Sequence, residues 1–157
     1  MIVAVSGHRT SAQDSSAVAQ RRVQIVADDF KVRLGLPQSV DVIVVPANAL
    51  LLSVEPVENS SPRRFNLRVE EDFVGGLSDD ELSAAVAHEL GHVWIFTHHP
   101  FLQTEQLAND IAMRVVARES LELLYEKVWK EKGTKGDLAT YLGPQRPQIK
   151  AGLAPAP

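Results

Sequence analysis

A five-residue segment, His88-Glu89-Leu90-Gly91-His92, places two imidazoles and a carboxylate at a spacing that suits metal chemistry. Residues four apart on an α-helix lie one turn above each other on the same face, so His88 and His92 can direct ring nitrogens at one cation. Zn²⁺ binds histidine pairs of this kind, and Glu89 would lie beside the open position of the metal, where a water molecule needs a base. The segment therefore predicts a zinc site with hydrolytic chemistry.

The residues before this segment predict the helix that must carry it. The five-residue pattern alone arises by chance in about one of a hundred chains with this His and Glu content, so its context matters. Ser78-Asp79-Asp80-Glu81 forms a capping box, which predicts a helix start, and we expect the helix to extend over about 78–97. Its apolar positions are Leu82, Ala85, Val86 and Leu90. The alternative is a buried helix whose two histidines make only structural hydrogen bonds.

A catalytic zinc usually has three protein ligands and one water, so the histidine pair needs a third partner. We expect Glu105, because a short turn after the motif would let a second helix, predicted over 103–131, run back antiparallel and present this carboxylate. His98 and Asp110 are the alternatives. His98 has the spacing of a longer HExxHxxGxxH pattern, but Ile95 occupies the glycine position, and Asp110 points away from the Glu105 face of the helix.

Two further roles near the metal depend on the second helix. Asn109 shares a face with Glu105, and we expect its side chain to accept a hydrogen bond from the outer N–H of a ligand histidine, which fixes the ring tautomer. A donor to the substrate oxygen is not identified, because Tyr125 would lie about 30 Å from Glu105 on a straight helix. The remaining candidates are Tyr141, His98 and His99.

The rest of the chain predicts an α+β fold around these residues. We expect a small sheet of three to four strands, packed on the motif helix and on the antiparallel second helix. The segment Arg64–Glu70 alternates between apolar and polar residues, which predicts a half-exposed strand that could pair with an extended peptide. Arg118 and Glu122 are expected to form an exposed ion pair. The other predicted elements are helices over 16–34 and 137–142 and strands over 41–45 and 50–57.

Length and composition indicate one soluble domain. The chain has 157 residues, a net charge of −4 and no Cys. The acidic balance argues against nucleic acid as a partner, and the absence of an apolar run of about 18 residues argues against a membrane span. We expect a domain over 16–142, a flexible segment over 1–15 and a disordered, proline-rich tail over 143–157. Residues 1–7 are similar to the end of a signal peptide, which favours export, although the apolar part is short and lacks a basic start.

Over roughly residues 63–118 the sequence resembles the gluzincin metallopeptidases. The segments similar to the core of the HtpX and CAAX-prenyl-protease family are 65–69, 77–82 and 87–92. Downstream, residues 105–109 are similar to the E-x-E-A-D block of that family and to the E-x-x-A-N block of the ImmA/IrrE-like peptidases. In both families the glutamate is the third zinc ligand, and the resemblance carries this role over to Glu105.

The sequence departs from the first family at Leu107 and at Asn109, where an aspartate is expected, and it lacks that family's membrane helices. A small minigluzincin is therefore the nearer comparison, and it implies a zincin-like fold. The resemblance also implies a zinc-dependent endopeptidase that hydrolyses peptide or protein substrates through a metal-activated water, with Glu89 as general base. Two alternatives stay open, namely an inactive zinc-binding scaffold and a metal-free interaction module. The oligomeric state is not predicted.

Overall fold

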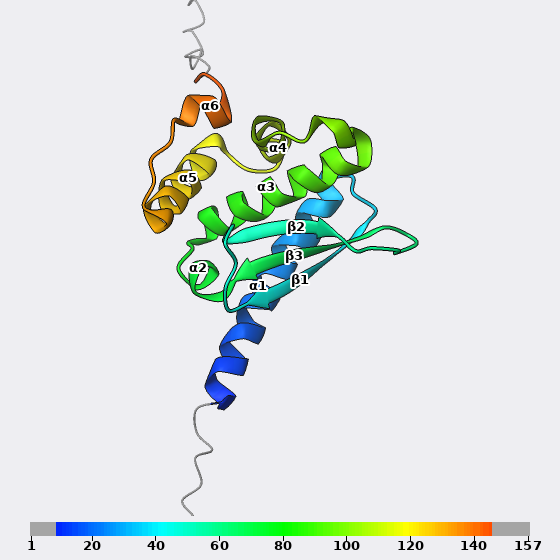
Figure 1. The fold of residues 1–157 in the computed structure, drawn as a ribbon, viewed down its shortest axis with the longest axis vertical. Coiled ribbons are helices and arrows are strands. Elements are labelled where there is room, and N and C mark those ends of the chain that lie inside the picture. The colour runs from blue at the N-terminus through cyan, green and yellow to red at the C-terminus, as the bar shows by residue number, and fades with distance from the viewer. Residues whose placement is uncertain (1–8, 146–157) are drawn as a thin grey trace, which may run out of the picture.

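A long N-terminal helix, a three-stranded sheet and a set of shorter helices form an α+β fold in the computed structural model (Figure 1). The structure describes residues 9–145, and side chains from residue 13 onward. The predicted fold class is confirmed. The elements in chain order are α1 (Arg9–Leu34), β1 (Ser39–Val45), β2 (Leu52–Pro56), β3 (Arg64–Glu70), α2 (Glu71–Gly75), α3 (Asp79–His98), the 3₁₀ helix η1 (Pro100–Leu102), α4 (Glu105–Ala112), α5 (Arg118–Lys132) and α6 (Leu138–Leu142).

The sheet has the strand order β1-β3-β2, with β1 parallel and β2 antiparallel to the central strand. The alternation expected for β3 is confirmed, because Phe65, Leu67 and Val69 are buried. The prediction that this strand could pair with a peptide is wrong, since β1 and β2 already bond to its two edges. The free edges belong to β1 and β2.

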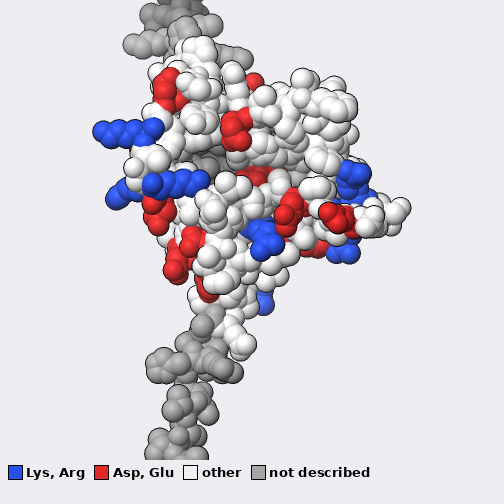
Figure 2. Space-filling view, viewed as in Figure 1, with Lys and Arg blue, Asp and Glu red and all other residues white. Residues whose placement is uncertain are grey.

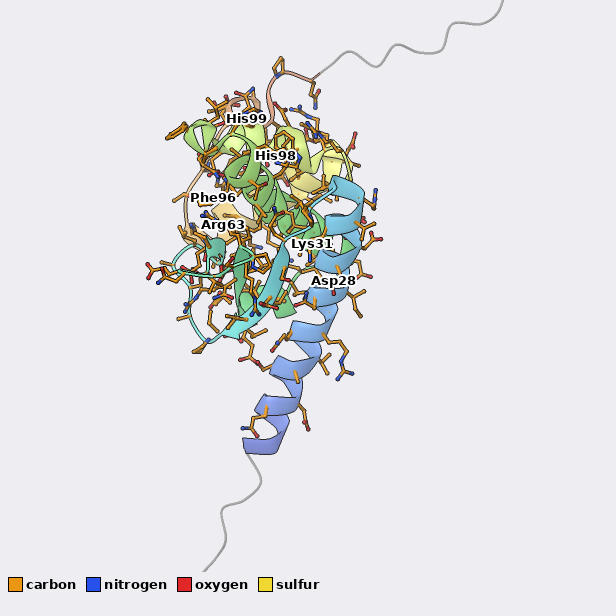
Figure 3. The ribbon with its side chains drawn as sticks, turned by 90° about the vertical axis from the view of Figure 1, so that its right-hand side faces the viewer. Asp28, Lys31, Arg63, Phe96, His98 and His99 are labelled. Atoms are coloured by element: carbon orange, nitrogen blue, oxygen red, sulfur yellow. The ribbon has the colours of Figure 1, made fainter. Side chains whose placement is uncertain are left out.

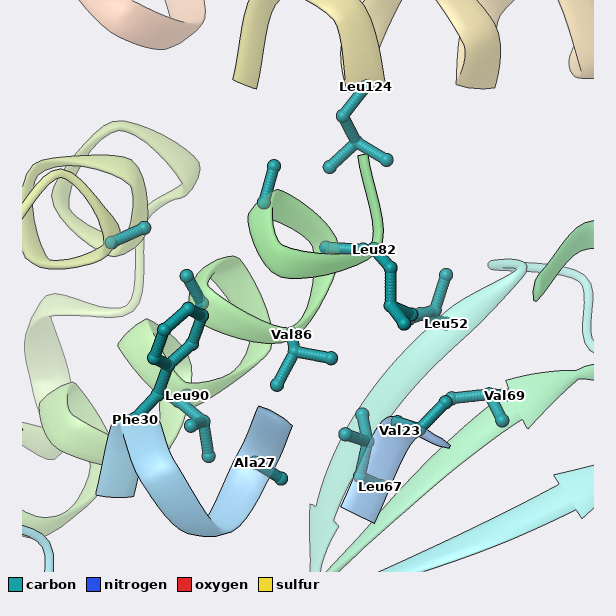
Figure 4. Packing of buried hydrophobic residues seen from close by; sticks show 14 of the residues in the cluster. Val23, Ala27, Phe30, Leu52, Leu67, Val69, Leu82, Val86, Leu90 and Leu124 are labelled. Atoms are coloured by element: carbon teal, nitrogen blue, oxygen red, sulfur yellow. The ribbon is translucent and has the colours of Figure 1, made fainter. Parts of the chain in front are cut away.

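Helix α3 lies at the centre of the fold, with α1 and the sheet on one side and α4 and α5 on the other (Figures 1 and 4). The predicted capping box begins it: the Glu81 amide donates to Ser78 Oγ at 3.3 Å, and the Ser78 amide donates to Glu81 Oε2 at 2.7 Å. Side chains of this helix fill the core between the layers. The fully buried members include Leu82, Val86 and Leu90. The motif helix is therefore held on both faces.

The single long helix predicted over 103–131 is wrong, because the chain forms α4 and α5 with a turn between them. After α4 the backbone hydrogen bonds join residues three apart instead of four. The Arg114 amide donates to Ile111 O at 3.0 Å, and the Val115 amide donates to Ala112 O at 2.9 Å. Ala117 is then extended. The chain reverses at this point, and α5 returns over α3 (Figure 1).

Other differences from the prediction lie at element ends. Helix α1 begins at Arg9, seven residues earlier than expected, and β1 begins at Ser39. The expected ion pair is present, with Arg118 bonded to Glu122 at 2.9 Å, but its expected exposure is wrong, because both side chains are only about a fifth exposed. Arg118 also donates to the carbonyls of Leu142 and Gly143 at the end of α6. The export segment and most of the tail lie outside the described residues. No helix between residues 9 and 145 is long and apolar enough to cross a membrane.

Candidate metal centre

Three side chains from two helices converge on one point. His88 Nε2 lies 3.2 Å from His92 Nε2 and 3.2 Å from Glu105 Oε2, and His92 Nε2 lies 3.5 Å from Glu105 Oε1. A tetrahedral metal with bonds of about 2.0–2.1 Å needs ligand atoms about 3.3–3.4 Å apart. The two Nε2 atoms are close to this separation, and each lies at a similar distance from one oxygen of the Glu105 carboxylate, so the donor set fits a zinc ion. Among the described residues, these three alone form such a group.

The close approach of α4 to α3 positions the carboxylate. A Cβ added at Gly91 would lie 2.4 Å from the carbonyl oxygen of Ala108, so only glycine allows this helix contact. Helix α4 begins at this acid, and the N-cap residue Thr104 accepts a hydrogen bond on its side chain from the Leu107 amide at 3.2 Å. Glu105 thus lies in the first turn of α4, facing both histidines.

The outer ring nitrogen of His88 meets a buried amide. His88 Nδ1 lies 2.7 Å from Asn109 Oδ1, and the Asn109 side chain is fully buried. The amide orientation is fixed, because Asn109 Nδ2 donates to Tyr125 Oη at 2.8 Å and to the Tyr141 carbonyl at 2.9 Å. The Nδ1 atom must therefore carry the proton, and the Nε2 lone pair faces Glu105.

A second amide orients His92 in the same way. His92 Nδ1 lies 3.0 Å from Gln103 Oε1, while Gln103 Nε2 donates to the His92 carbonyl at 3.1 Å. Two Nε2 lone pairs and one carboxylate, all acceptors, then face the same point. Only a cation or a shared proton satisfies such an arrangement. The donor set can therefore hold a metal ion.

The charges around this point shift one another's pKa values. When His88 is protonated on both ring nitrogens, the hydrogen bond from its Nε2 lowers the pKa of Glu105. Burial alone would lower the pKa of His88, but the hydrogen bond to Glu105 and the charges of Glu89 and Glu105 raise it. The two shifts are reciprocal, since the histidines lower the pKa of Glu105 and the carboxylates raise the pKa of His88. The field at the convergence point favours positive charge.

Glu89 is buried beside the two histidines, with 8% of its surface exposed. Burial raises its pKa, and the charge of Glu105 adds to this effect, whereas His88, His92 and a backbone hydrogen bond from Val54 oppose it. A buried carboxyl with a raised pKa beside a group of metal-binding residues is suited to accept and release a proton.

A cleft of about 680 Å³ opens at these residues, between β2 and α5 (Figure 2). Its walls are mostly apolar. The apolar lining includes Leu52, Val54, Phe65, Phe96, Leu124 and Val128. Such a cleft can accept an extended chain with large apolar side chains.

Tyr125 lies in this cleft, which corrects the distance inferred from a straight helix. Its ring centroid is 6.3 Å from that of His88, because α5 folds back over α3. The hydroxyl accepts from Asn109, and its own proton has no acceptor among residues 13–145. Burial raises the pKa of this hydroxyl, so it stays protonated. Tyr125 is therefore a free hydrogen-bond donor at the site.

The other candidates lie elsewhere. His98 stacks on Trp94 with ring centroids 4.1 Å apart and bonds the Trp94 carbonyl, and His99 lies next to it at the end of α3 (Figure 3). Neither histidine lines the cleft. Asp110 is exposed and is not part of the group formed by His88, His92 and Glu105. Tyr141 does line the cleft. Gln103 was not anticipated, because nothing in its local sequence distinguishes it from an ordinary turn residue.

No family model matches this sequence, and no curated protein matches it. Among solved structures, the crystal structure of the metallopeptidase zymogen of Pyrococcus abyssi abylysin is similar, with a TM-score of 0.51 and 15% sequence identity. The similarity covers 72% of this chain and 97% of that chain. At this identity the likeness shows a shared fold. The chain therefore has a metallopeptidase-like fold with a group of residues that can bind a metal.

Proposed function

We propose that this protein is a zinc-dependent endopeptidase whose metal is held by His88, His92 and Glu105. The observation that carries the proposal is the convergence of the two Nε2 atoms, 3.2 Å apart, on the Glu105 carboxylate, whose oxygens lie 3.2 and 3.5 Å from them. Both outer histidine nitrogens are bonded to amide oxygens. The likeness to a metallopeptidase fold supports the choice of hydrolysis. Zn²⁺ in this site would supply Lewis acidity and lower the pKa of a bound water.

Glu89 is the proposed proton carrier of the reaction. Its carboxylate takes the proton of the attacking water and passes it to the leaving amine. Burial raises the pKa of this carboxyl in the metal-free protein, which favours proton uptake.

Tyr125 is the proposed donor to the substrate carbonyl oxygen, where negative charge develops during attack. The hydroxyl is anchored as acceptor to Asn109, which leaves its proton for the substrate. A donor fixed in this way stabilises the charge without reorganisation. Asn109 therefore connects the histidine ligand and the oxygen donor.

The free edge of β2 is the proposed binding strand for the substrate backbone, in place of β3. Bonds from the Glu70 amide to Leu51 O and from the Val57 amide to Arg64 O place the odd-numbered residues of β2 in the ladder with β3. Leu52 and Val54 therefore direct their peptide groups to the free edge, along the cleft. Main-chain bonds of this kind select extended peptides with little sequence preference.

The test combines metal analysis and digestion with the purified full chain. Wild type should contain one zinc per chain and cleave casein, whereas Glu105→Ala should lose zinc and activity. Asp110→Ala is the matched control and should retain both. Zinc without cleavage in wild type would indicate an inactive scaffold. A wild type that neither retains zinc without chelator nor rebinds it would overturn the proposal.

A further inference from the structure

The outward face of α1 carries three apolar side chains that the fold leaves uncovered. Val18 is 65%, Ile25 65% and Val32 81% exposed. They lie seven residues apart, and seven residues of an α-helix return to the same face with a drift of only about 20°. The three side chains therefore form one straight stripe. Exposed apolar residues in line are far less usual than scattered ones.

This stripe points directly away from the body of the molecule. The buried face of α1 contains Val23, Ala27, Phe30 and Leu34. At about 100° per residue, these lie roughly 140–180° from Ile25 around the helix axis. Figures 1 and 3 show α1 along the outside, with its first turns extending beyond the other elements. A partner helix can approach the stripe without meeting the rest of the fold.

Charged residues lie symmetrically about Ile25 with opposite signs. Arg21 and Arg22 precede it, Asp28 and Asp29 follow it, and all except Arg22 are exposed. Arg22 is bonded to Asp79 at 2.8 Å, whereas Arg21 has no acidic partner within residues 13–145. The stripe is thus self-complementary when a second helix runs antiparallel. A parallel pair would place like charges together.

We propose that α1 is the association surface for a second copy of this chain, with the two helices antiparallel and both Ile25 side chains at the two-fold axis. Val18 then contacts the partner's Val32, and Arg21 lies on the same side and at nearly the same height as the partner's Asp28. The contact is small for a protein interface, so the dimer is transient. The stripe faces away from the cleft, so this association is independent of zinc and of catalysis.

Sedimentation velocity over a concentration series tests the association. Wild type should form a dimer, and Ile25→Lys should raise the dissociation constant at least about tenfold. The matched control is Leu123→Lys on α5, an apolar residue 49% exposed, and it should behave as wild type. Arg21→Asp and Asp28→Arg should each weaken the dimer, and the double exchange should restore it. A wild type that is monomeric throughout, or an equal effect of both Lys variants, would overturn the proposal.

Cross-linking tests the direction of the helices, because the chain has no Cys and introduced thiols are the only ones. A disulfide needs Cβ atoms about 3.5–4.5 Å apart. Ile25→Cys should cross-link with itself, and a mixture of Val18→Cys and Val32→Cys should give the mixed dimer. Val18→Cys alone should not cross-link, since its two copies would be about 21 Å apart along the axis. Efficient self-cross-linking of that variant would refute the antiparallel arrangement.

Discussion

Helix α3 carries two glutamates, Glu81 and Glu89, whose surroundings shift their pKa values in opposite directions. Glu81 lies in the first turn, where the Ser78 amide donates to it and Lys127 Nζ lies 2.9 Å away. Burial alone would raise the pKa of Glu81, but these partners lower it. Glu89 is buried at the middle of the helix, where burial and the charge of Glu105 raise its pKa.

The difference shows which charges the fold satisfies by itself. Around Glu81, the capping hydrogen bonds and a lysine from α5 complete the site and attach α5 to the start of α3. Beside Glu89, the Glu105 carboxylate and two histidine lone pairs face one point, and no lysine or arginine of the described residues is paired with them. The first arrangement stabilises the fold, and the second prepares a place for an external charge.

The largest expected effect comes from Glu89→Gln. If this carboxylate moves protons, cleavage should fall by about 10²–10⁴-fold, while zinc content stays near one per chain. The free energy of unfolding of the metal-free protein should not decrease, because the substitution removes a buried charge and keeps the side-chain volume. Digestion, metal analysis and urea unfolding measure the three quantities. A marked loss of stability would show that Glu89 is a structural charge like Glu81.

Tyr125→Phe should have the next largest effect. Loss of the proposed donor should lower kcat by about 10²-fold, with KM and zinc content little changed. Tyr141→Phe is the matched control, because this ring lines the same cleft and is 5.0 Å from the Tyr125 ring, yet its hydroxyl has no bond among the described residues. Equal kcat values for the two variants would remove Tyr125 from the reaction.

Local sequence patterns were sufficient for the motif helix, and less so for its surroundings. The capping box and the spacing of the two histidines act within a few turns of one helix, so both could be read directly, and a short connection was enough to bring Glu105 nearby. The break after α4 was not predictable, since Val115 fits the helical periodicity and no Gly or Pro marks the turn. The position of Tyr125 depends on that break.

The order of the strands could not be predicted from the sequence either, because it depends on contacts between distant segments. The alternation of β3 indicates one buried face, which the structure confirms, but it carries no information about which strands bond to its edges. The alternation therefore predicts β3 as the strand that pairs with a peptide, whereas the free edge beside the cleft belongs to β2. Two features therefore account for the main wrong predictions. They are the non-local pairing of the strands and the turn between α4 and α5, which no Gly or Pro marks.

Asn109→Ala should have an intermediate effect that links the two regions. The variant removes the acceptor of His88 Nδ1 and leaves the Tyr125 hydroxyl without its donor. Zinc affinity should fall by about 10–100-fold, measured by competition with a chelator. Asn109→Asp should restore much of the affinity, because a carboxylate can accept the same proton. Equal affinity for Asn109→Ala and wild type would exclude a role in orienting His88.

The smallest expected effect is on stability, from Glu81→Gln. The substitution removes the ion pair between Glu81, 15% exposed, and Lys127, 32% exposed. This loss should lower the free energy of unfolding by about 1 kcal/mol at neutral pH. Because the folded pKa of Glu81 is lowered, this contribution is complete above the usual Glu pKa of about 4.3 and is lost as the pH falls through the folded pKa. Urea unfolding of both proteins from neutral to acidic pH should show the difference closing at the acidic end. A difference that stays constant over this range would mean that the capping hydrogen bonds, and not the charge, hold the start of α3.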